Sequence, residues 1–383
     1  MKLLHLADLH LGRSLGDYSL FQDQKYILDQ ILAIAVREAV DGVLIAGDVY
    51  DKSIPSEAAT RLLDGFLRIL AESGICTYMI SGNHDSDDRL QYGSTLFASS
   101  RIYISAVFDG HMIRHTLEDG QTAANIYLLP FIKASQVRHY YPEVRIETYE
   151  DAVRTVLENA DIKDDQINIM VAHQFVTGSS DDPALGGSEG AGAKSVGTVE
   201  KIGYDCFHRF DYVALGHIHS PQQVGRPEIR YAGSPLKYSL SEAENHKSVP
   251  LITIEGKGNI TIDLLPLSPL RDLRHVRGKL ADLLQGTEGS EDFLYATLTD
   301  EDFVDEAMTI FRQVYPNTVK IDYDNTRTRE VEQVDISQIA GNRSFDELIG
   351  DFYRQIYQCD ISEEEMAIMR MAAREAGVID ATD

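Results

Sequence analysis

Side chains that can bind metal ions recur in five short clusters between Asp8 and His219. The clusters are Asp8-Leu9-His10, Gly47-Asp48, Gly82-Asn83-His84-Asp85, His173 and Gly216-His217-Ile218-His219. Carboxylate and amide oxygens combined with imidazole nitrogens suit Mn²⁺ or Fe²⁺, and also Zn²⁺ at a catalytic rather than a structural site. The ligands are too many for one ion and fit two. Because two ions about 3.5–4 Å apart can clamp an in-line displacement at phosphorus, the clusters predict hydrolysis of phosphoesters.

Apolar segments precede the clusters and predict strands that position them. These segments are Leu3–Ala7, Val43–Ala46, Ile75–Ile80, Ile167–Ala172 and Tyr212–Leu215. Helical periodicity over 23–40 and 56–73 lies between them, which indicates an α/β fold. Since ligands of open α/β sheets gather at the carboxyl ends of the strands, we expect all five clusters at one sheet edge. Residues two apart share a strand face, so Asp8 with His10, and His217 with His219, are each expected to converge on one point.

The later part of the chain predicts further strands and two more domains. Short strands over 229–232, 249–254 and 260–264 indicate an antiparallel end to the sheet system. Beyond Pro266 and Pro269, a strand over 293–298, a helix over 302–314 and a strand over 319–323 predict a small α+β domain. Apolar spacing over 345–377, with Ser362 as an N-cap, predicts a helix pair. We therefore expect domains at 1–268, 269–342 and 343–383.

A glycine-rich segment, 177–197, predicts a surface loop beside the candidate site. A lid over the site and a merely mobile insertion are equally compatible with its composition.

Composition excludes several classes of protein. The chain has 383 residues, of which 43% are hydrophobic and 25% charged, so it is neither fibrous nor disordered. No apolar stretch approaches the ~20 residues of a membrane helix, and no signal peptide is evident, which favours a cytoplasmic protein. Cys76, Cys206 and Cys359 are odd in number and far apart, which excludes a disulfide framework and a CxxC site.

The net charge of −26 argues at first against a polyanionic partner. The acidity is uneven, however, because residues 281–383 carry 24 acidic and 8 basic side chains, which leaves −10 for residues 1–280. Carboxylates that bind cations further exaggerate the formal charge of the first part. A phosphate-containing substrate near the clusters therefore stays compatible with the composition.

The motifs and their order resemble the calcineurin-like metallophosphoesterase superfamily over about residues 1–265. In chain order they are D-x-H, G-D-x-x-D, G-N-H-D, a lone H and G-H-x-H. Within this superfamily, four segments resemble the SbcD nuclease family. They are A-D-L-H-L-G at 7–12, A-G-D-V-Y-D at 46–51, V-A-H-Q at 171–174 and A-G-S-P-L-K-Y-S at 232–239. The resemblance implies a metallophosphoesterase β-sandwich flanked by helices (α/β/β/α), followed by a small α+β capping domain and a C-terminal helix pair.

The same resemblance implies roles for individual residues. Asp8, His10 and His219 would hold a first metal ion, Asp48 would bridge two ions, and Asn83, His173 and His217 would hold the second. His84 would act without binding metal, by stabilising the transition state or by protonating the leaving oxygen. Asp51 and Asp85 would orient histidine N–H groups or turns. Two divalent ions are implied, with Mn²⁺ the foremost choice.

Family members are metal-dependent exonucleases on duplex DNA and endonucleases at hairpins or blocked ends, and they act in DNA break processing, repair, recombination and replication. They work with an SMC-like ATPase, SbcC, as a homodimer within a heterotetramer. The segment F-D-E-L-I-G-D-F-Y-R at 345–354 resembles the helical segment that docks on the coiled coil of that ATPase. Basic residues near the motifs are candidates for DNA contacts: Arg13, Lys52, Arg89, Lys133 and Lys237.

Two other functions stay open at this point. The metal motifs do not select DNA, so a small-molecule or cyclic-nucleotide phosphodiesterase or phosphatase of the same superfamily is an alternative. The C-terminal helices argue against it, because a partner would bury their apolar face, although they can also pack on their own domain. A non-catalytic scaffold is the third hypothesis. Such a protein is expected to have lost metal ligands, whereas this sequence contains every candidate ligand and His84.

Overall fold

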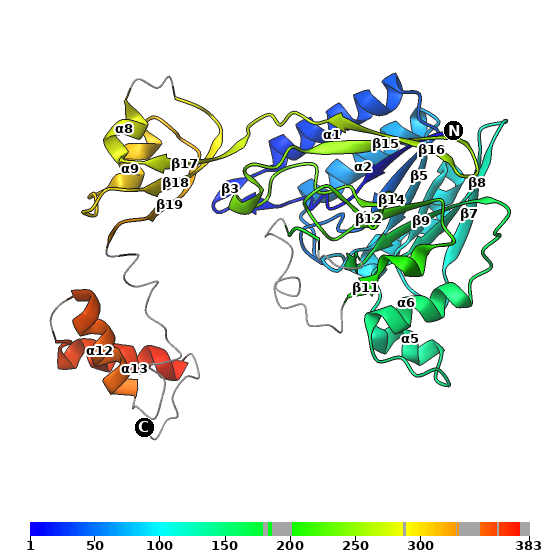
Figure 1. The fold of residues 1–383 in the computed structure, drawn as a ribbon. Helices are drawn as coiled ribbons and strands as arrows, with labels where there is room; N and C mark the ends of the chain where they lie inside the picture. The colour runs from blue at the N-terminus through cyan, green and yellow to red at the C-terminus, as the bar shows by residue number, and fades with distance from the viewer. Residues whose placement is uncertain are drawn as a thin grey trace. The chain divides into compact units, whose positions relative to one another are not determined.

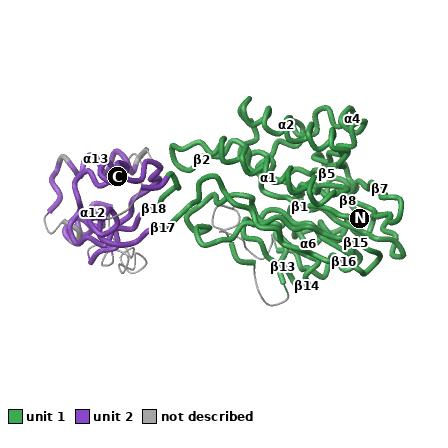
Figure 2. Tube along the Cα trace, turned by 90° about the horizontal axis from the view of Figure 1, so that it is seen from above, with its two compact units in different colours: residues 1–275, 291–294 green, residues 276–290, 295–383 purple. Residues whose placement is uncertain are grey.

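The computed structural model describes residues 1–178, 183–185, 201–285, 289–326, 328, 345–357 and 360–375. Most of the predicted glycine-rich loop at 177–197 lies outside the described residues, as does the stretch 329–344. The chain divides into two compact units, coloured separately in Figure 2. The first comprises Met1–His275 with Glu291–Leu294, and the second comprises Val276–Ser290 with Tyr295–Asp383.

A six-stranded sheet in the first unit carries the N-terminal clusters. Its order is β16 (Asn259–Pro266), β15 (Ser248–Gly256), β1 (Lys2–Leu6), β4 (Gly42–Ala46), β5 (Cys76–Ile80) and β6 (Ile102–Ser105). The strands β1, β4, β5 and β6 are parallel, whereas β15 and β16 add on antiparallel. Helices α1 (Phe21–Arg37) and α2 (Glu57–Glu72) connect the parallel strands and run along this sheet (Figure 1). Ser56 caps the N-terminus of helix α2, since its hydroxyl accepts a hydrogen bond from the Ala59 N–H.

A second six-stranded sheet carries the later clusters. Its order is β13 (Gln222–Val224), β14 (Arg226–Tyr231), β12 (Tyr212–Gly216), β9 (Ile167–His173), β8 (Ala123–Leu129) and β7 (Ile113–Glu118). The predicted antiparallel end of the sheet system is right for β15 and β16 but wrong for β14, which runs parallel to β12. The intervening edge strand β13 reverses the chain, so β14 enters the sheet in the same direction as β12.

The two sheets pack face to face. Leu3, Leu44 and Tyr78 from the first sheet share one core with Ile169 and Tyr212 from the second. On its other face, the second sheet packs against helix α6 (Tyr149–Glu158) in a separate core. This core includes Tyr127, Met170 and Val213 from the sheet and Val153 and Val156 from α6. Helix α5 (Ala134–Tyr140) joins the same layer through Ala134 and Val137. The expected α/β/β/α sandwich is confirmed, and strands covered on both faces read as continuous apolar runs.

Shorter elements complete the first unit. They are β2 (Ser14–Leu15), β3 (Tyr18–Ser19), α3 (Asp87–Gln91), α4 (Ser94–Phe97), β10 (Val176–Thr177) and β11 (Ile202–Gly203), with 3₁₀ turns η1 (Ala98–Ser100), η2 (Tyr204–Phe207) and η3 (Leu240–Glu242). Cys76 and Cys206 are buried free thiols. Among the residues that the structure describes, no helix combines the length and apolar character needed to cross a membrane.

The second unit contains most of a small three-stranded sheet. Its order is β17 (Leu273–Gly278), β18 (Phe293–Leu298) and β19 (Thr318–Tyr323), with helices α8 (Leu280–Leu284) and α9 (Ala307–Arg312). Helix α9 is shorter than the predicted helix over 302–314, because Glu306 has a φ of 54° and interrupts the helical backbone.

The predicted C-terminal helix pair forms α12 (Phe345–Tyr357) and α13 (Glu363–Glu375). Ser362 caps α13, since its hydroxyl accepts from the Glu365 N–H at 3.3 Å. An ion pair between Arg370 and Asp346 joins the two helices. The domain limits at 268 and 342 stay predictions.

Candidate metal centre

The candidate ligands come from the carboxyl ends of both sheets. Asp8 and His10 follow β1, Asp48 follows β4 and Asn83 follows β5, whereas His173 ends β9 and His217 and His219 follow β12. The prediction of a single sheet edge is therefore wrong. A cluster at the end of a strand looks the same in either sheet, and only the face-to-face packing brings the two edges together.

The loops that carry the ligands have an unusual backbone. Four of these residues have positive φ values, in a region that residues other than glycine rarely adopt. The values are 53° for Asp8, 43° for His10, 46° for Asp48 and 98° for His217. Hydrogen bonds between the loops hold this conformation: the Asp8 N–H donates to Gly47 O at 3.1 Å, and the His10 N–H donates to Asp48 O at 2.9 Å. Such strain is typical of functional sites, where the surrounding structure enforces it.

Close backbone approach explains two glycines beside the ligands. A Cβ on Gly216 would lie 1.9 Å from the carbonyl oxygen of Ala46, and a Cβ on Gly82 would lie 2.1 Å from Oδ1 of Asp48. Both distances are far below any contact that a methyl group tolerates. The ends of the two sheets can therefore meet at β4 and β12 only with glycine at 216.

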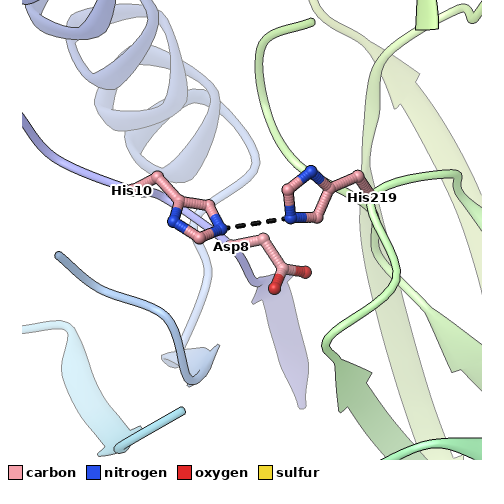
Figure 3. Close-up of side chains that lie close together, drawn as sticks. All are labelled: Asp8, His10 and His219. Atoms are coloured by element: carbon pink, nitrogen blue, oxygen red, sulfur yellow. Dashed lines mark hydrogen bonds between the residues drawn. The ribbon is translucent and has the colours of Figure 1, made fainter. Parts of the chain in front are cut away.

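Asp8, His10 and His219 form the first ligand group (Figure 3). Nε2 of His10 and Nε2 of His219 lie 3.1 Å apart, and the ligand atoms of the three residues lie within 4.8 Å of one another. All three side chains are buried. Figure 3 shows the two imidazoles approaching from opposite sides, with the Asp8 carboxylate beside them.

Asn83, His173 and His217 form the second ligand group. Oδ1 of Asn83 lies 3.1 Å from Nε2 of His173 and 3.0 Å from Nδ1 of His217. Asn83 is exposed and His217 is partly exposed, so this side of the centre faces solvent. The expectation that His217 and His219 converge on one point is wrong, because β12 ends at Gly216 and the residues beyond it no longer alternate as in a strand.

Asp48 lies between the two groups. Its Oδ2 is 3.6 Å from Nε2 of His10 and 3.4 Å from Nε2 of His173, while its Oδ1 accepts from the His84 N–H at 2.9 Å. Burial alone would raise the pKa of Asp48, but the positive charge that His173 can carry holds that pKa well below its usual range. Oδ2 is thus an ionised atom shared by both groups.

The orientation of His173 indicates a cation between the ligands. Its Nδ1 donates to Ala46 O at 2.8 Å, so in the neutral ring Nε2 carries a lone pair. That lone pair faces two oxygens, from Asn83 and Asp48, at hydrogen-bonding range. Burial lowers the pKa of His173, yet the charge of Asp48 prevails and raises that pKa to about 9. A proton on Nε2 removes the repulsion between its lone pair and the two oxygens. A divalent cation bound between these atoms would remove the same repulsion, and the nitrogen and oxygen donors are suitable ligands for such a cation.

Burial affects the other carboxylates of the centre. It raises the pKa of Asp8 to about 6, against the opposing charges of His173 and His219. Burial and the charge of Asp48 raise the pKa of Asp85 to about 6 as well. The Asp85 carboxylate accepts the N–H groups of Val49, Tyr50 and Gly82, at 3.1, 2.9 and 2.9 Å. It thereby ties together the two loops that carry Asp48 and Asn83.

Asp51 and His84 lie beside the centre. Oδ1 of Asp51 accepts from Arg13 at 2.9 Å, and its 3.7 Å separation from Nδ1 of His10 is too long for a hydrogen bond. Nδ1 of His84 donates to the carbonyl oxygen of Asp51 at 3.2 Å, and the His84 ring lies 4.9 Å from that of His10. His84 is partly exposed, so it borders the open side of the centre.

Glu242 and Lys247 are two residues beside the centre that the sequence motifs miss. Oε1 of Glu242 lies 3.5 Å from Nδ1 of His219, and Nζ of Lys247 lies 2.6 Å from Oε2 of Glu242. Both side chains are buried. They follow the last motif in an ordinary polar stretch, S-E-A-E-N-H-K, where only the fold shows which of the acidic residues turns inward.

The candidate basic residues fall into two classes. Lys52, Arg89 and Lys133 are exposed, and the described part of the chain offers them no ion pair within 4.0 Å. Arg13, in contrast, pairs with Asp51, and Lys237 pairs with Asp272 at 2.9 Å. The first three are therefore available to a substrate.

Comparison with known proteins places the chain in a family. The calcineurin-like phosphoesterase model matches residues 1–221, and the model described as the type 5 capsule protein repressor C-terminal domain matches residues 269–357. The SbcD subunit of nuclease SbcCD from Staphylococcus epidermidis is 34% identical over 327 residues, which cover 84% of this chain and 85% of the relative. The SbcD subunit of nuclease SbcCD from Staphylococcus saprophyticus is 34% identical over 367 residues, 93% of each chain.

Among solved structures, a dimetal phosphatase from Danio rerio is similar with a TM-score of 0.37 and 12% identity, over 70% of this chain and 99% of that one. The match to the phosphoesterase model covers all of the candidate ligands. The identity to the two relatives extends over most of both chains. The chain therefore belongs to the SbcD family of calcineurin-like phosphoesterases and is a metal-dependent nuclease.

Proposed function

We propose that this chain is the nuclease subunit of a DNA-processing complex and that it hydrolyses phosphodiesters at a centre of two divalent metal ions. The observation that carries the proposal is the position of Asp48, whose Oδ2 lies within 3.6 Å of Nε2 of His10 and 3.4 Å of Nε2 of His173. One carboxylate oxygen thus serves two ligand groups, as a two-ion centre requires.

The first ion is assigned to Asp8, His10, His219 and Asp48. The second is assigned to Asp48 and the three residues that contact one another on the open side, namely Asn83, His173 and His217. Mn²⁺ is the proposed metal, because the donors are imidazole, carboxylate and amide with no thiolate. Ions bound there would polarise the phosphodiester and lower the pKa of a water molecule.

His84 is proposed to exchange a proton with the leaving oxygen or to stabilise the transition state. Its Nδ1 donates to a carbonyl oxygen, which can only accept, so Nε2 is the atom available to a substrate. The hydrogen bond from its main-chain N–H to Asp48 fixes the distance between this ring and the shared carboxylate. Asp85 and Asp51 are proposed to position the loops and His84 rather than to bind metal.

Duplex DNA ends and hairpins are the proposed substrates, with exonuclease activity on the former and endonuclease activity at hairpins or blocked ends. The relatives are named nucleases, which favours DNA over a small phosphoester. The solvent-facing side of the centre, formed by Asn83, His84 and His217, is where a phosphate would enter. The exposed Lys52, Arg89 and Lys133 are proposed to contact the phosphate backbone.

An SbcC-type SMC-like ATPase is the proposed partner, bound through the C-terminal helices, with two copies of this chain in a heterotetramer. The relatives are named as one subunit of SbcCD, which supports a complex. Phe352 on α12 and Ile368 and Met371 on α13 are exposed, which fits helices that bury an apolar face on a partner. The domains proposed are the nuclease domain at 1–268, the capping domain at 269–342 and the docking helices at 343–383.

The test is Mn²⁺-dependent cleavage of a labelled hairpin-ended duplex by the purified chain, with and without the ATPase and ATP. A small phosphodiester serves as the parallel substrate, and His84→Ala as the inactive control. We expect the duplex to be cleaved, the partner to stimulate cleavage, and His84→Ala to be inactive on both substrates. Hydrolysis of the small ester with DNA left intact, even with the partner present, would instead identify a small-molecule phosphodiesterase.

A further inference from the structure

A buried ion pair lies directly behind one of the candidate metal ligands. Glu242 ends the 3₁₀ turn η3, and its side chain has no exposed surface, while that of Lys247 is 4% exposed. Oε1 of Glu242 faces Nδ1 of His219 at 3.5 Å, on the side of the ring opposite to Nε2, which faces His10. The carboxylate thus contacts the back of the imidazole.

Hydrogen bonds hold Glu242 in this position from several sides. Nζ of Lys247 donates to Oε2 of Glu242 at 2.6 Å, to Oγ of Ser234 at 2.9 Å and to the carbonyl oxygen of His219 at 2.9 Å. Oγ of Ser239 donates to Oε1 at 3.2 Å. Lys247 therefore anchors both the carboxylate and the main chain of His219, and it fixes one relative to the other.

Stability gives no reason for charges at this place. Removing a carboxylate and an ammonium group from water costs several kcal/mol each, and apolar residues of similar volume are often as stable or more so. A carboxylate behind a histidine does, however, fix which ring nitrogen carries the hydrogen and increases the electron density at the other nitrogen.

Two other candidate ligand histidines are supported differently. Nδ1 of His173 donates to a neutral carbonyl oxygen, that of Ala46. Nδ1 of His10 is buried without a hydrogen-bond partner among the described residues, and the Asp51 carboxylate 3.7 Å from it is paired with Arg13. Of these three histidines, His219 is the one whose ring is backed by a buried carboxylate, and it belongs to the first ligand group.

We propose that Glu242 is a positioning residue for the first metal ion. It accepts the hydrogen of Nδ1 of His219 and so leaves the lone pair of Nε2 directed at that ion, while Lys247 holds the carboxylate in place. This inference rests on the proposed two-ion function. It assigns to Glu242 an effect on one ion only.

The experiment measures Mn²⁺ binding to the full chain by titration calorimetry and by the electron paramagnetic resonance of free Mn²⁺, with hydrolysis of a small phosphodiester as a second readout. We expect Glu242→Gln to weaken one of the two Mn²⁺ sites by about 10–100-fold and to leave the other within a factor of about three. Raising the Mn²⁺ concentration should restore most of the turnover, because the residue acts through the ligand and does not touch the substrate.

A double variant, Glu242→Leu with Lys247→Met, separates positioning from folding. Replacing both charges should recover much of the thermal stability that Glu242→Gln loses, since no unpaired charge stays buried. Mn²⁺ affinity should stay low, because leucine at 242 offers Nδ1 of His219 no acceptor at all. Asp211→Asn, which breaks the ion pair with Lys257 at the opposite end of β12 from His217 and His219, is the control that should lower stability and leave Mn²⁺ affinity unchanged.

Two results would overturn the inference: wild-type Mn²⁺ affinity in Glu242→Gln, or recovery of that affinity in the double variant together with stability. Failure of the proposed function has a different signature. In that case the wild-type chain itself would bind fewer than two Mn²⁺ ions or would hydrolyse no phosphodiester, whatever residue stands at 242.

Discussion

Gly216→Ala tests whether the close approach of the two sheets at the metal centre is essential. The added Cβ would lie 1.9 Å from Ala46 O and 2.7 Å from Nδ1 of His173, the two atoms that share the hydrogen bond orienting that ring. The φ of Gly216 is not in the left-handed region, so alanine suffers no backbone strain there and the effect is purely steric.

The magnitude follows from this overlap. To reach even 3.0 Å, the shortest distance that real Cβ contacts show, the ends of β4 and β12 must separate by about 1 Å, and a displacement of that size at reacting groups costs about 10²-fold in rate. Overpacking of this kind also lowers the free energy of unfolding by about 1–3 kcal/mol. We therefore expect Gly216→Ala to lose at least about 100-fold in kcat/KM and a few degrees in Tm.

The assay is Mn²⁺-dependent hydrolysis of a small phosphodiester, with thermal unfolding followed by circular dichroism. Gly256→Ala is the matched control, because a Cβ there meets nothing within 4 Å. That variant should keep wild-type activity and stability. If Gly216→Ala retains kcat/KM within about threefold of the control, the sheets have room to separate and the steric account is refuted.

Three further predictions concern the proposed function. Asp48→Ala should abolish Mn²⁺ binding at both sites together with activity, because both ligand groups share Oδ2, and equilibrium dialysis that finds one site intact would contradict the bridging role. His84→Ala should keep both Mn²⁺ ions and lose about 10²–10⁴-fold in kcat, and loss of metal in the same dialysis would remove it from proton transfer. Deletion of 343–383 should spare hydrolysis of a small phosphodiester and abolish co-elution with the ATPase in gel filtration, so unchanged co-elution would move the docking site elsewhere.

Local sequence signals predict best the strands that are buried along their whole length, such as β4 and β9. The segment at 293–298 is mostly apolar and forms β18 with those limits, and β1, β4 and β9 differ from their predicted limits by a residue or two at an end. Such runs report burial, which is a local property. They carry no information on which sheet a strand joins, and for that reason the sequence places the ligands at one edge instead of two.

The residues of the candidate site likewise differ in how well the local sequence predicts them. Asp8 and His173 stand at the ends of apolar runs, where a charged or aromatic polar residue is conspicuous. Glu242 and Lys247 stand in a stretch rich in serine and acidic residues, and nothing local distinguishes them from solvated charges. Their burial arises from contacts with His219, 23 and 28 residues away in the chain, which only the folded structure supplies.

The assembly of the centre from two sheets has a consequence for synthesis. Asp8 and the His217 N–H that donates to it are 209 residues apart. A nascent chain that has emerged only as far as β9 contains Asp8, His10 and Asp48 but neither of the histidines that follow β12. Lys247 and the strands β15 and β16 of the first sheet come later still in the chain, so the two-sheet arrangement around the centre is complete only when the chain has been synthesised through β16. A product truncated before β12 therefore lacks two of the candidate metal ligands, His217 and His219.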